Sequence, residues 1–114
     1  MNISYEGIGQ CAATFENDGV AVGQMAKISG DAKAAPCANG DAFAGMVLSV
    51  SRDEAACSMA LNGIVTVAYS GTAPAVGWQG LSADGNGGVK TAASGKQYLV
   101  IQRNETAKTV TFVL

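Results

Sequence analysis

The chain has 114 residues, a net charge of −2 and charged side chains at only 14% of its positions, whereas about 25% is ordinary. This length suits one domain that buries roughly two-thirds of its unfolded surface. The lysines and arginines are scattered, which argues against the concentrated positive charge that nucleic-acid binding requires. No apolar run approaches the roughly 20 residues of a membrane span, and the N-terminal sequence MNISYEGIGQC lacks the features of a secretory signal.

The expected fold is all-β: a single small barrel or sandwich of about eight short strands. We expect residues 1–18 to form an irregular N-terminal arm, with room for one strand over 9–15, and residues 19–114 to form a single β domain. Short apolar runs alternate with Gly-, Asn- and Asp-rich turns at roughly 8–12-residue spacing, which is typical of such a domain. The predicted strands are 20–29 with a bend at Gly23, 42–51 with a kink at Gly45, 55–61, 64–70, 76–83, 89–93, 98–102 and 109–114. Residues 32–38, which include Pro36, fit an edge strand or an extended loop.

Asn62-Gly63 lies between two of these apolar runs. Asn-Gly is the preferred pair for a two-residue type I′ turn, so the sequence predicts that 55–61 folds back on 64–70 as a hairpin. In that hairpin Leu61 faces Ile64 and Met59 faces Thr66. An alternative stays open, because Ser51–Glu54 is a capping-box pattern and Gly63 could end a helix over 52–62.

The sequence predicts no catalytic, cofactor-binding or metal site. Histidine is absent, which removes the commonest general base and metal ligand. Most carboxylates lie beside Gly or Asn, where Asp caps turns. The stretch 94–97 fails the phosphate-loop pattern, and Asp84–Gly88 lacks the glutamate that completes a calcium loop. We therefore expect a protein that is not an enzyme; a small enzyme subunit with its active site elsewhere is the weakest hypothesis.

Two further sets of residues have both a structural and a functional interpretation. Cys11, Cys37 and Cys57 lack metal-ligand spacing, and we expect free, buried thiols in a reducing environment. Trp78 and Tyr69 could form a sugar-stacking platform, although each is more simply explained as a core or interface aromatic. The low surface charge also indicates a partner or self-association.

Five segments carry a resemblance that covers about residues 19–114. They are Gly19–Gly23 (GVAVG), Asn39–Val47 (NGDAFAGMV), Leu61–Val67 (LNGIVTV), Ser70–Gly77 and Asp84–Val89. Together they resemble the small capsid decoration (cement) proteins encoded in the head modules of tailed phages and prophages. The three cysteines and the Ser51–Glu54 pattern depart from that family.

The resemblance implies a structural virion protein that binds the outside of an expanded capsid and stiffens it, often as a homotrimer. Its partners would be the major capsid protein and other copies of itself, and it would assemble onto the virion in the bacterial cytoplasm. Closed symmetry creates repeated contacts that need no active site. Residues 1–15 would be an arm that orders on docking. The alternative function is a carbohydrate- or surface-binding β module without catalysis.

Overall fold

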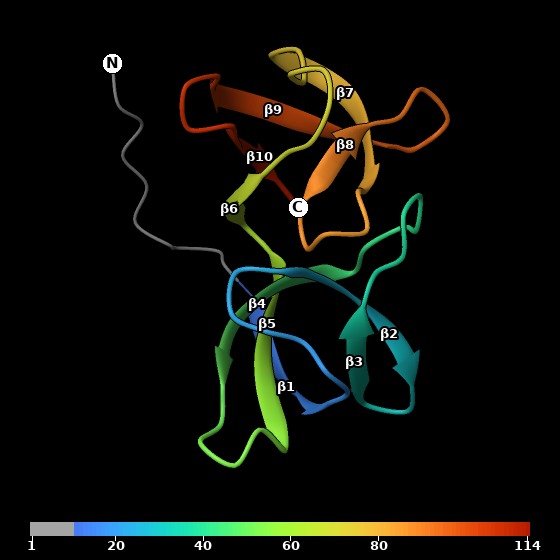
Figure 1. Cartoon of the computed structure of the whole chain (residues 1–114), viewed down its shortest axis with the longest axis vertical. Helices are drawn as coiled ribbons and strands as arrows, with labels where there is room; N and C mark the ends of the chain where they lie inside the picture. The colour runs from blue at the N-terminus through green and yellow to red at the C-terminus, as the bar shows by residue number, and fades with distance from the viewer. Residues whose placement is uncertain (1–10) are drawn as a thin grey trace.

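The computed structural model describes residues 11–114, which form an all-β structure of ten strands in two sheets (Figure 1). The sheets are stacked along the longest axis of the molecule, and each is built from about half of the chain. The predicted all-β class is confirmed. A small closed barrel is combined with a second five-stranded sheet.

The first five strands close into the barrel in the spatial order β1-β3-β2-β4-β5, and β5 pairs with β1. Closure leaves no unpaired edge among them. β3 lies between β1 and β2, so the prediction of an edge strand here is wrong, and Pro36 is its last residue. The strands are β1 Cys11–Asn17, β2 Met25–Gly30, β3 Lys33–Pro36, β4 Gly45–Val50 and β5 Ala56–Asn62.

The second sheet has the order β6-β10-β9-β7-β8, with antiparallel neighbours throughout. A single parallel bridge between Tyr69 and Val89 brings the chain after β6 beside β8. The C-terminus is held at the junction of the sheets, where the Leu114 N–H donates to the Gly63 carbonyl at 2.8 Å. The strands are β6 Ile64–Ala68, β7 Gly77–Ala83, β8 Val89–Thr91, β9 Lys96–Asn104 and β10 Thr109–Val113.

The predicted Asn62-Gly63 hairpin is wrong. Residues 56–62 and 64–68 are both strands, but β5 pairs with β1 and β4 in the barrel, whereas β6 pairs with β10. Gly63 has φ of 104° and Asn62 keeps a negative φ, so the pair does not form a type I′ turn. Instead this dipeptide is the crossing from one sheet to the other. The alternative helix over 52–62 is also wrong, because Ser51–Glu54 is the β4–β5 turn.

The segment 1–18, predicted as an arm, contains a strand of the barrel. β1 pairs with β5 from Cys11 to Glu16 and with β3 at Glu16 and Asn17. β1 overlaps the strand expected over 9–15, but this strand belongs to the barrel, so the β structure begins by residue 11 and includes part of the predicted arm. The rest of the predicted arm, residues 1–10, lies outside the described residues. The predicted strand over 20–29 begins later than expected, at Met25, because a turn closed by Gln24 and Ala21 precedes it.

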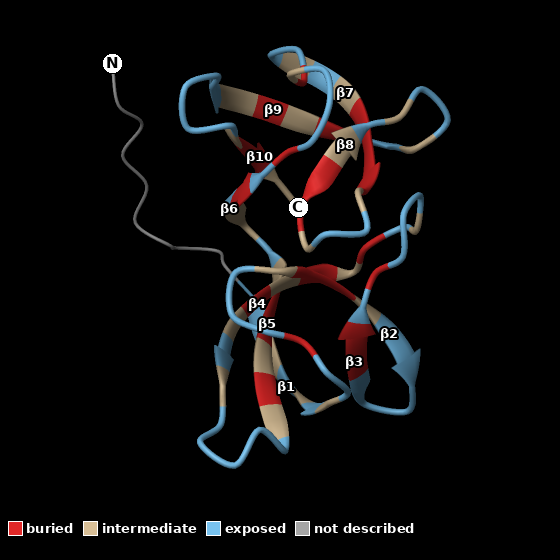
Figure 2. Cartoon of the chain, in the orientation of Figure 1, coloured by how far each residue is buried: buried red, intermediate tan, exposed pale blue. Residues whose placement is uncertain are grey.

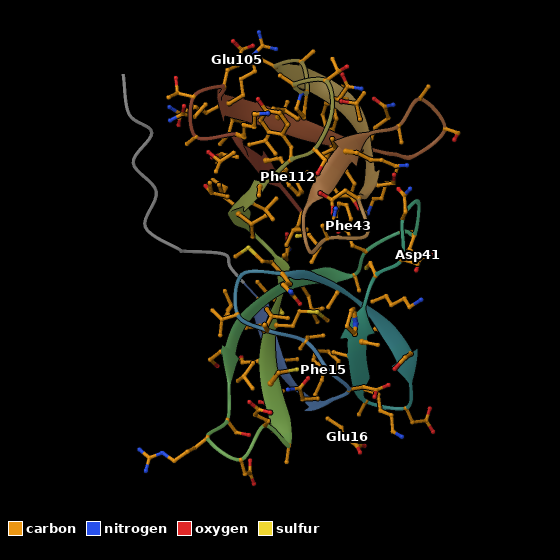
Figure 3. All side chains as sticks on the ribbon, viewed as in Figure 1. Phe15, Glu16, Asp41, Phe43, Glu105 and Phe112 are labelled. Carbon is orange, nitrogen blue, oxygen red and sulfur yellow. The ribbon has the colours of Figure 1, made fainter. Side chains whose placement is uncertain are left out.

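Two apolar clusters fill the molecule, and Figure 2 shows the buried segments running through both sheets. The smaller cluster lies in the barrel around Val47 and Met59. The larger one packs against the inner face of the second sheet and includes Met25 and Ala60 of the barrel, so it joins the second sheet to the barrel. In this cluster the rings of Phe43, Tyr98 and Phe112 lie 5.1 to 5.9 Å apart between centroids. Phe43 and Phe112 are labelled in Figure 3.

Candidate docking surface

Four apolar side chains form a row across the outer face of the second sheet. Trp78 of β7 lies opposite Leu99 of β9, Leu99 lies opposite Val113 of β10, and Val113 lies opposite Ile64 of β6. Residues that face one another across paired strands share a face of the sheet. Their chain neighbours Val65, Val100 and Phe112 are buried in the core, so the row lies on the opposite, outward face. We call Trp78, Leu99, Val113 and Ile64 the apolar row.

The row is accessible at its Trp78 end. The Trp78 residue is 71% exposed, and Val76, in the bend before β7, is 63% exposed. A hollow of about 210 Å³ lies over this part of the sheet, with walls that include Trp78, Leu99, Val113 and Leu114. Tryptophan offers a large rigid surface and is enriched at protein interfaces. An outward row of this kind is therefore a candidate surface for docking another protein.

Few charges would be desolvated if this surface were covered. Among the residues that line the hollow, Lys96 has the only charged side chain. Lys96 lies at the margin, with its ammonium 5.3 Å from the centre of the Tyr98 ring. Burying a charge is costly unless it is paired, so a nearly uncharged face favours contact with another protein surface.

Trp78 and Tyr69 do not form the sugar-stacking platform that was the less favoured interpretation of the sequence. Tyr69 is 7% exposed and belongs to the core of the second sheet, whereas Trp78 lies on the outer face. The structural interpretation is correct for Tyr69, which is a core aromatic. Sequence analysis singled out Trp78 but missed Leu99, Val113 and Ile64. Only the strand register, which no local motif encodes, places these three beside the tryptophan.

Asp41, Asp53 and Asp84 cap turns, as the sequence predicts. Asp84 Oδ1 accepts the N–H groups of Asn86 at 2.7 Å and Gly88 at 3.0 Å, and its Oδ2 accepts the Ser70 hydroxyl at 2.6 Å. Asp53 likewise accepts the Ala55 N–H and the Ser51 hydroxyl, and these bonds lower the pKa of its carboxyl. Within residues 11–114 no three metal-ligating side chains gather at one place.

Asp41 fixes the connection between β3 and β4. Its Oδ2 accepts the Ala38 N–H at 2.9 Å and lies 2.8 Å from Lys27 Nζ. The Lys27 hydrogen bond is the largest cause lowering the pKa of Asp41, and the same bond raises the pKa of Lys27. Both side chains are partly exposed, and the pair ties β2 to the loop that contains Ala38 and Asp41.

The three cysteines are free thiols at separate places. Cys37 and Cys57 are buried, as predicted, and burial raises the pKa of each thiol. Cys11 is exposed, contrary to the prediction of burial. It begins β1 opposite Asn62, where the register shifts.

No protein-family model matches the sequence, and no curated protein matches it. Helices long and apolar enough to cross a membrane are absent from the described part of the chain.

Proposed function

We propose that this protein is a phage capsid decoration protein, which binds the outer surface of the shell through its apolar row and stabilises it. The observation that carries the proposal is the outward row that ends at the exposed Trp78. The sequence resemblance over about residues 19–114 supplies the class of partner, the major capsid protein. A decoration protein needs a folded β core and a surface that fits a neighbouring protein. Its role does not require it to make or break a covalent bond.

The arrangement of the core supports this role. A protein that stiffens a shell must transmit load between its contacts, and the larger apolar cluster joins the second sheet to the barrel. Close-packed interiors have low compressibility and transmit strain. Force applied at the apolar row would therefore pass through the Phe43, Tyr98 and Phe112 cluster to the barrel.

Copies of the protein are expected to associate as a homotrimer. Closed point-group assemblies repeat the same contact around an axis, which matches the local three-fold positions of an icosahedral shell. Light scattering after size exclusion should give about 34 kDa, three times the 11.4 kDa of one chain. A mass of one chain at high concentration would contradict the trimer and leave shell binding to be tested separately.

The predicted role of the N-terminus in docking remains a prediction. Deleting residues 1–10 leaves all ten described strands in place, whereas a longer deletion would remove Cys11 and Ala12 of β1. The shortened chain should fold and lose shell binding. Unchanged binding would show that the segment has no part in docking.

A carbohydrate-binding module is the second candidate, and the 71% exposure of Trp78 favours it. An exposed indole can stack on a sugar ring. Quenching of Trp78 fluorescence by glycans would support this function. Absence of quenching by capsular and cell-wall glycans would leave the docking surface as the explanation for the exposed ring.

A further inference from the structure

The dipeptide Asn62-Gly63 connects the barrel to the second sheet (Figure 1). β5 is the last strand of the barrel and β6 is the first strand of the second sheet, so the strands of the two sheets are joined along the described chain only here. The Gly63 carbonyl also accepts the Leu114 N–H at 2.8 Å, which fastens the C-terminus to the same point. We call Asn62-Gly63 the crossing dipeptide.

The Asn62 side chain lies against the backbone nitrogen of the next residue. Gly63 N donates a hydrogen bond to Asn62 Oδ1 at 2.8 Å. Because a carbonyl bond is about 1.2 Å long, Asn62 Cγ lies within about 4 Å of this nitrogen. Groups that are held this close need only a small rotation of the side chain to come within reacting distance. Asn62 is exposed, so water reaches the amide, and Gly63 has no side chain to shield its nitrogen.

From this geometry we infer that the crossing dipeptide is a self-modification site, at which Asn62 is converted to aspartate and isoaspartate. A base from the solvent takes the proton of Gly63 N as this nitrogen bonds to Asn62 Cγ, and the side-chain nitrogen leaves as ammonia. The product is a five-membered succinimide ring. Water then opens the ring: cleavage of the new bond gives aspartate, and cleavage of the original peptide bond gives isoaspartate. This inference does not rest on the proposed function.

The sequence contains two other Asn-Gly pairs, and the first, Asn39-Gly40, is held against this reaction. The Gly40 N–H donates to the Ala83 carbonyl at 2.8 Å, so attack by this nitrogen would break a backbone hydrogen bond. The surrounding loop is closed by a further bond, in which the Asp41 N–H donates to the Ala38 carbonyl at 3.0 Å. We therefore expect this pair to react more slowly than the crossing dipeptide.

The second pair, Asn86-Gly87, is fixed in a turn. The N–H groups of Asn86 and Gly88 both donate to Asp84 Oδ1, at 2.7 and 3.0 Å. The Gly87 carbonyl accepts the Met25 N–H at 2.8 Å. The peptide group that must rotate is thus held on both sides, whereas the nitrogen of the crossing dipeptide is bonded to the side chain with which it would react. We expect the crossing dipeptide to be the first of the three pairs to be converted.

Isoaspartate at residue 62 would disturb the connection between the sheets. The chain would then run through Cβ and Cγ of this residue and would be one backbone atom longer. The additional atom would displace Gly63 from the Leu114 N–H and residue 62 from its partner Cys11. Aspartate would add only a negative charge at an exposed position. We therefore expect the isoaspartate form to be less stable than the aspartate form.

The test is peptide mapping of the intact chain during incubation at 37 °C in mildly alkaline buffer made with ¹⁸O-labelled water. The label marks residues that are converted during the incubation and not during digestion. Trypsin places Asn39 in the peptide 34–52 and the other two sites in 53–90, where fragmentation distinguishes them. Labelled aspartate and isoaspartate should form at residue 62 about fivefold or more faster than at residues 39 and 86, because reaction there requires the loss of hydrogen bonds.

Matched variants and unfolding separate the geometry from the sequence motif. N62Q keeps a neutral amide on a longer side chain and should abolish conversion at residue 62, whereas N86Q should leave it unchanged. In urea the preference for residue 62 should disappear, because the unfolded chain does not hold the other two pairs. The isoaspartate form, purified by ion exchange, should have a urea midpoint about 0.5 M or more below that of N62D.

Three results would overturn the inference: no label at residue 62, faster conversion at residue 39 or 86 in the folded chain, or the same ratio of rates in the folded and unfolded chains. Equal urea midpoints for the isoaspartate form and N62D would refute the effect on the connection between the sheets.

Discussion

Lys27 Nζ lies 2.8 Å from Asp41 Oδ2, and this contact ties β2 of the barrel to the connection that carries Phe43 into the larger core. The pair therefore acts at the junction of the two sheets. Its strength depends on the charge of the Asp41 carboxylate, which makes the junction sensitive to acid.

Stability should fall in acid because the pKa of Asp41 is lowered in the folded chain from its ordinary value of 3.8. Between the lowered folded-state pKa and pH 3.8, the unfolded chain therefore binds more protons than the folded chain does. The contribution of Asp41 is thus fully present above pH 3.8 and is lost as the pH falls through the lowered folded-state pKa. Urea unfolding at pH 7 and at pH 3 should show a smaller loss for D41N than for the parent chain. Equal losses in the two proteins would assign the acid sensitivity to other groups, such as Asp53, whose pKa is also lowered.

Gly45 should be intolerant of a side chain. A Cβ at this position would meet the carbonyl oxygen of Ala60 on the adjoining strand, and backbone of a packed barrel cannot move away cheaply. G45A should lower the free energy of unfolding by about 3 kcal/mol. G30A is the matched control, because its Cβ would have only the Lys33 side chain at 3.6 Å, and it should change stability by about 0.5 kcal/mol or less. Similar urea midpoints for the two variants would contradict this packing.

The aromatic cluster should couple the two halves of the molecule. F112A removes a fully buried ring and should cost about 3–5 kcal/mol. Phe43 and Phe112 lie 5.9 Å apart between centroids, so a double-mutant cycle with F43A should show a coupling of about 1 kcal/mol. W78A, at an exposed ring, should change stability by about 0.5 kcal/mol or less. Additive effects of F43A and F112A would show that the rings do not support one another.

The three thiols should differ in reactivity. Thiolates react with disulfide reagents, and both exposure and a low pKa favour the reaction. Cys11 is exposed, whereas Cys37 and Cys57 are buried with raised pKa values. The native chain should therefore release one equivalent of thionitrobenzoate rapidly, and C11S should release none at that rate. Rapid reaction of all three thiols without denaturant would contradict the burial of Cys37 and Cys57.

Strands near the C-terminus could be predicted from sequence because their side chains alternate. In β10, Val110 and Phe112 are in the core and Thr109 and Val113 are half-buried, while Thr111 between them is a buried polar residue that contacts the Thr66 hydroxyl. The turns at Asp53 and Asp84 could also be predicted, since each aspartate caps its own local backbone. Such features depend on residues close together in the chain.

The pairing of β5 and β6 could not be predicted in this way. Asn62-Gly63 has the composition of a hairpin turn, but β5 is held by β1 and β4 on its two edges, and β6 is held by β10. Contacts distant in sequence thus override the local preference of this dipeptide. The apolar row could not be predicted for the same reason, because Trp78, Leu99 and Val113 come together only through the register of β7, β9 and β10.

The most direct test of capsid binding through the apolar row is co-sedimentation with shells assembled from the major capsid protein encoded in the same genome. The parent chain should pellet with the shells at a saturable ratio. V76S/W78S, which changes the exposed Trp78 of the row and the exposed Val76 just before β7, should stay in the supernatant. V22S/I28S, which changes two exposed apolar residues of the β2 region, should pellet as the parent does. A parent chain that stays in the supernatant would contradict capsid binding, and V76S/W78S pelleting like the parent would contradict the apolar row as its docking surface.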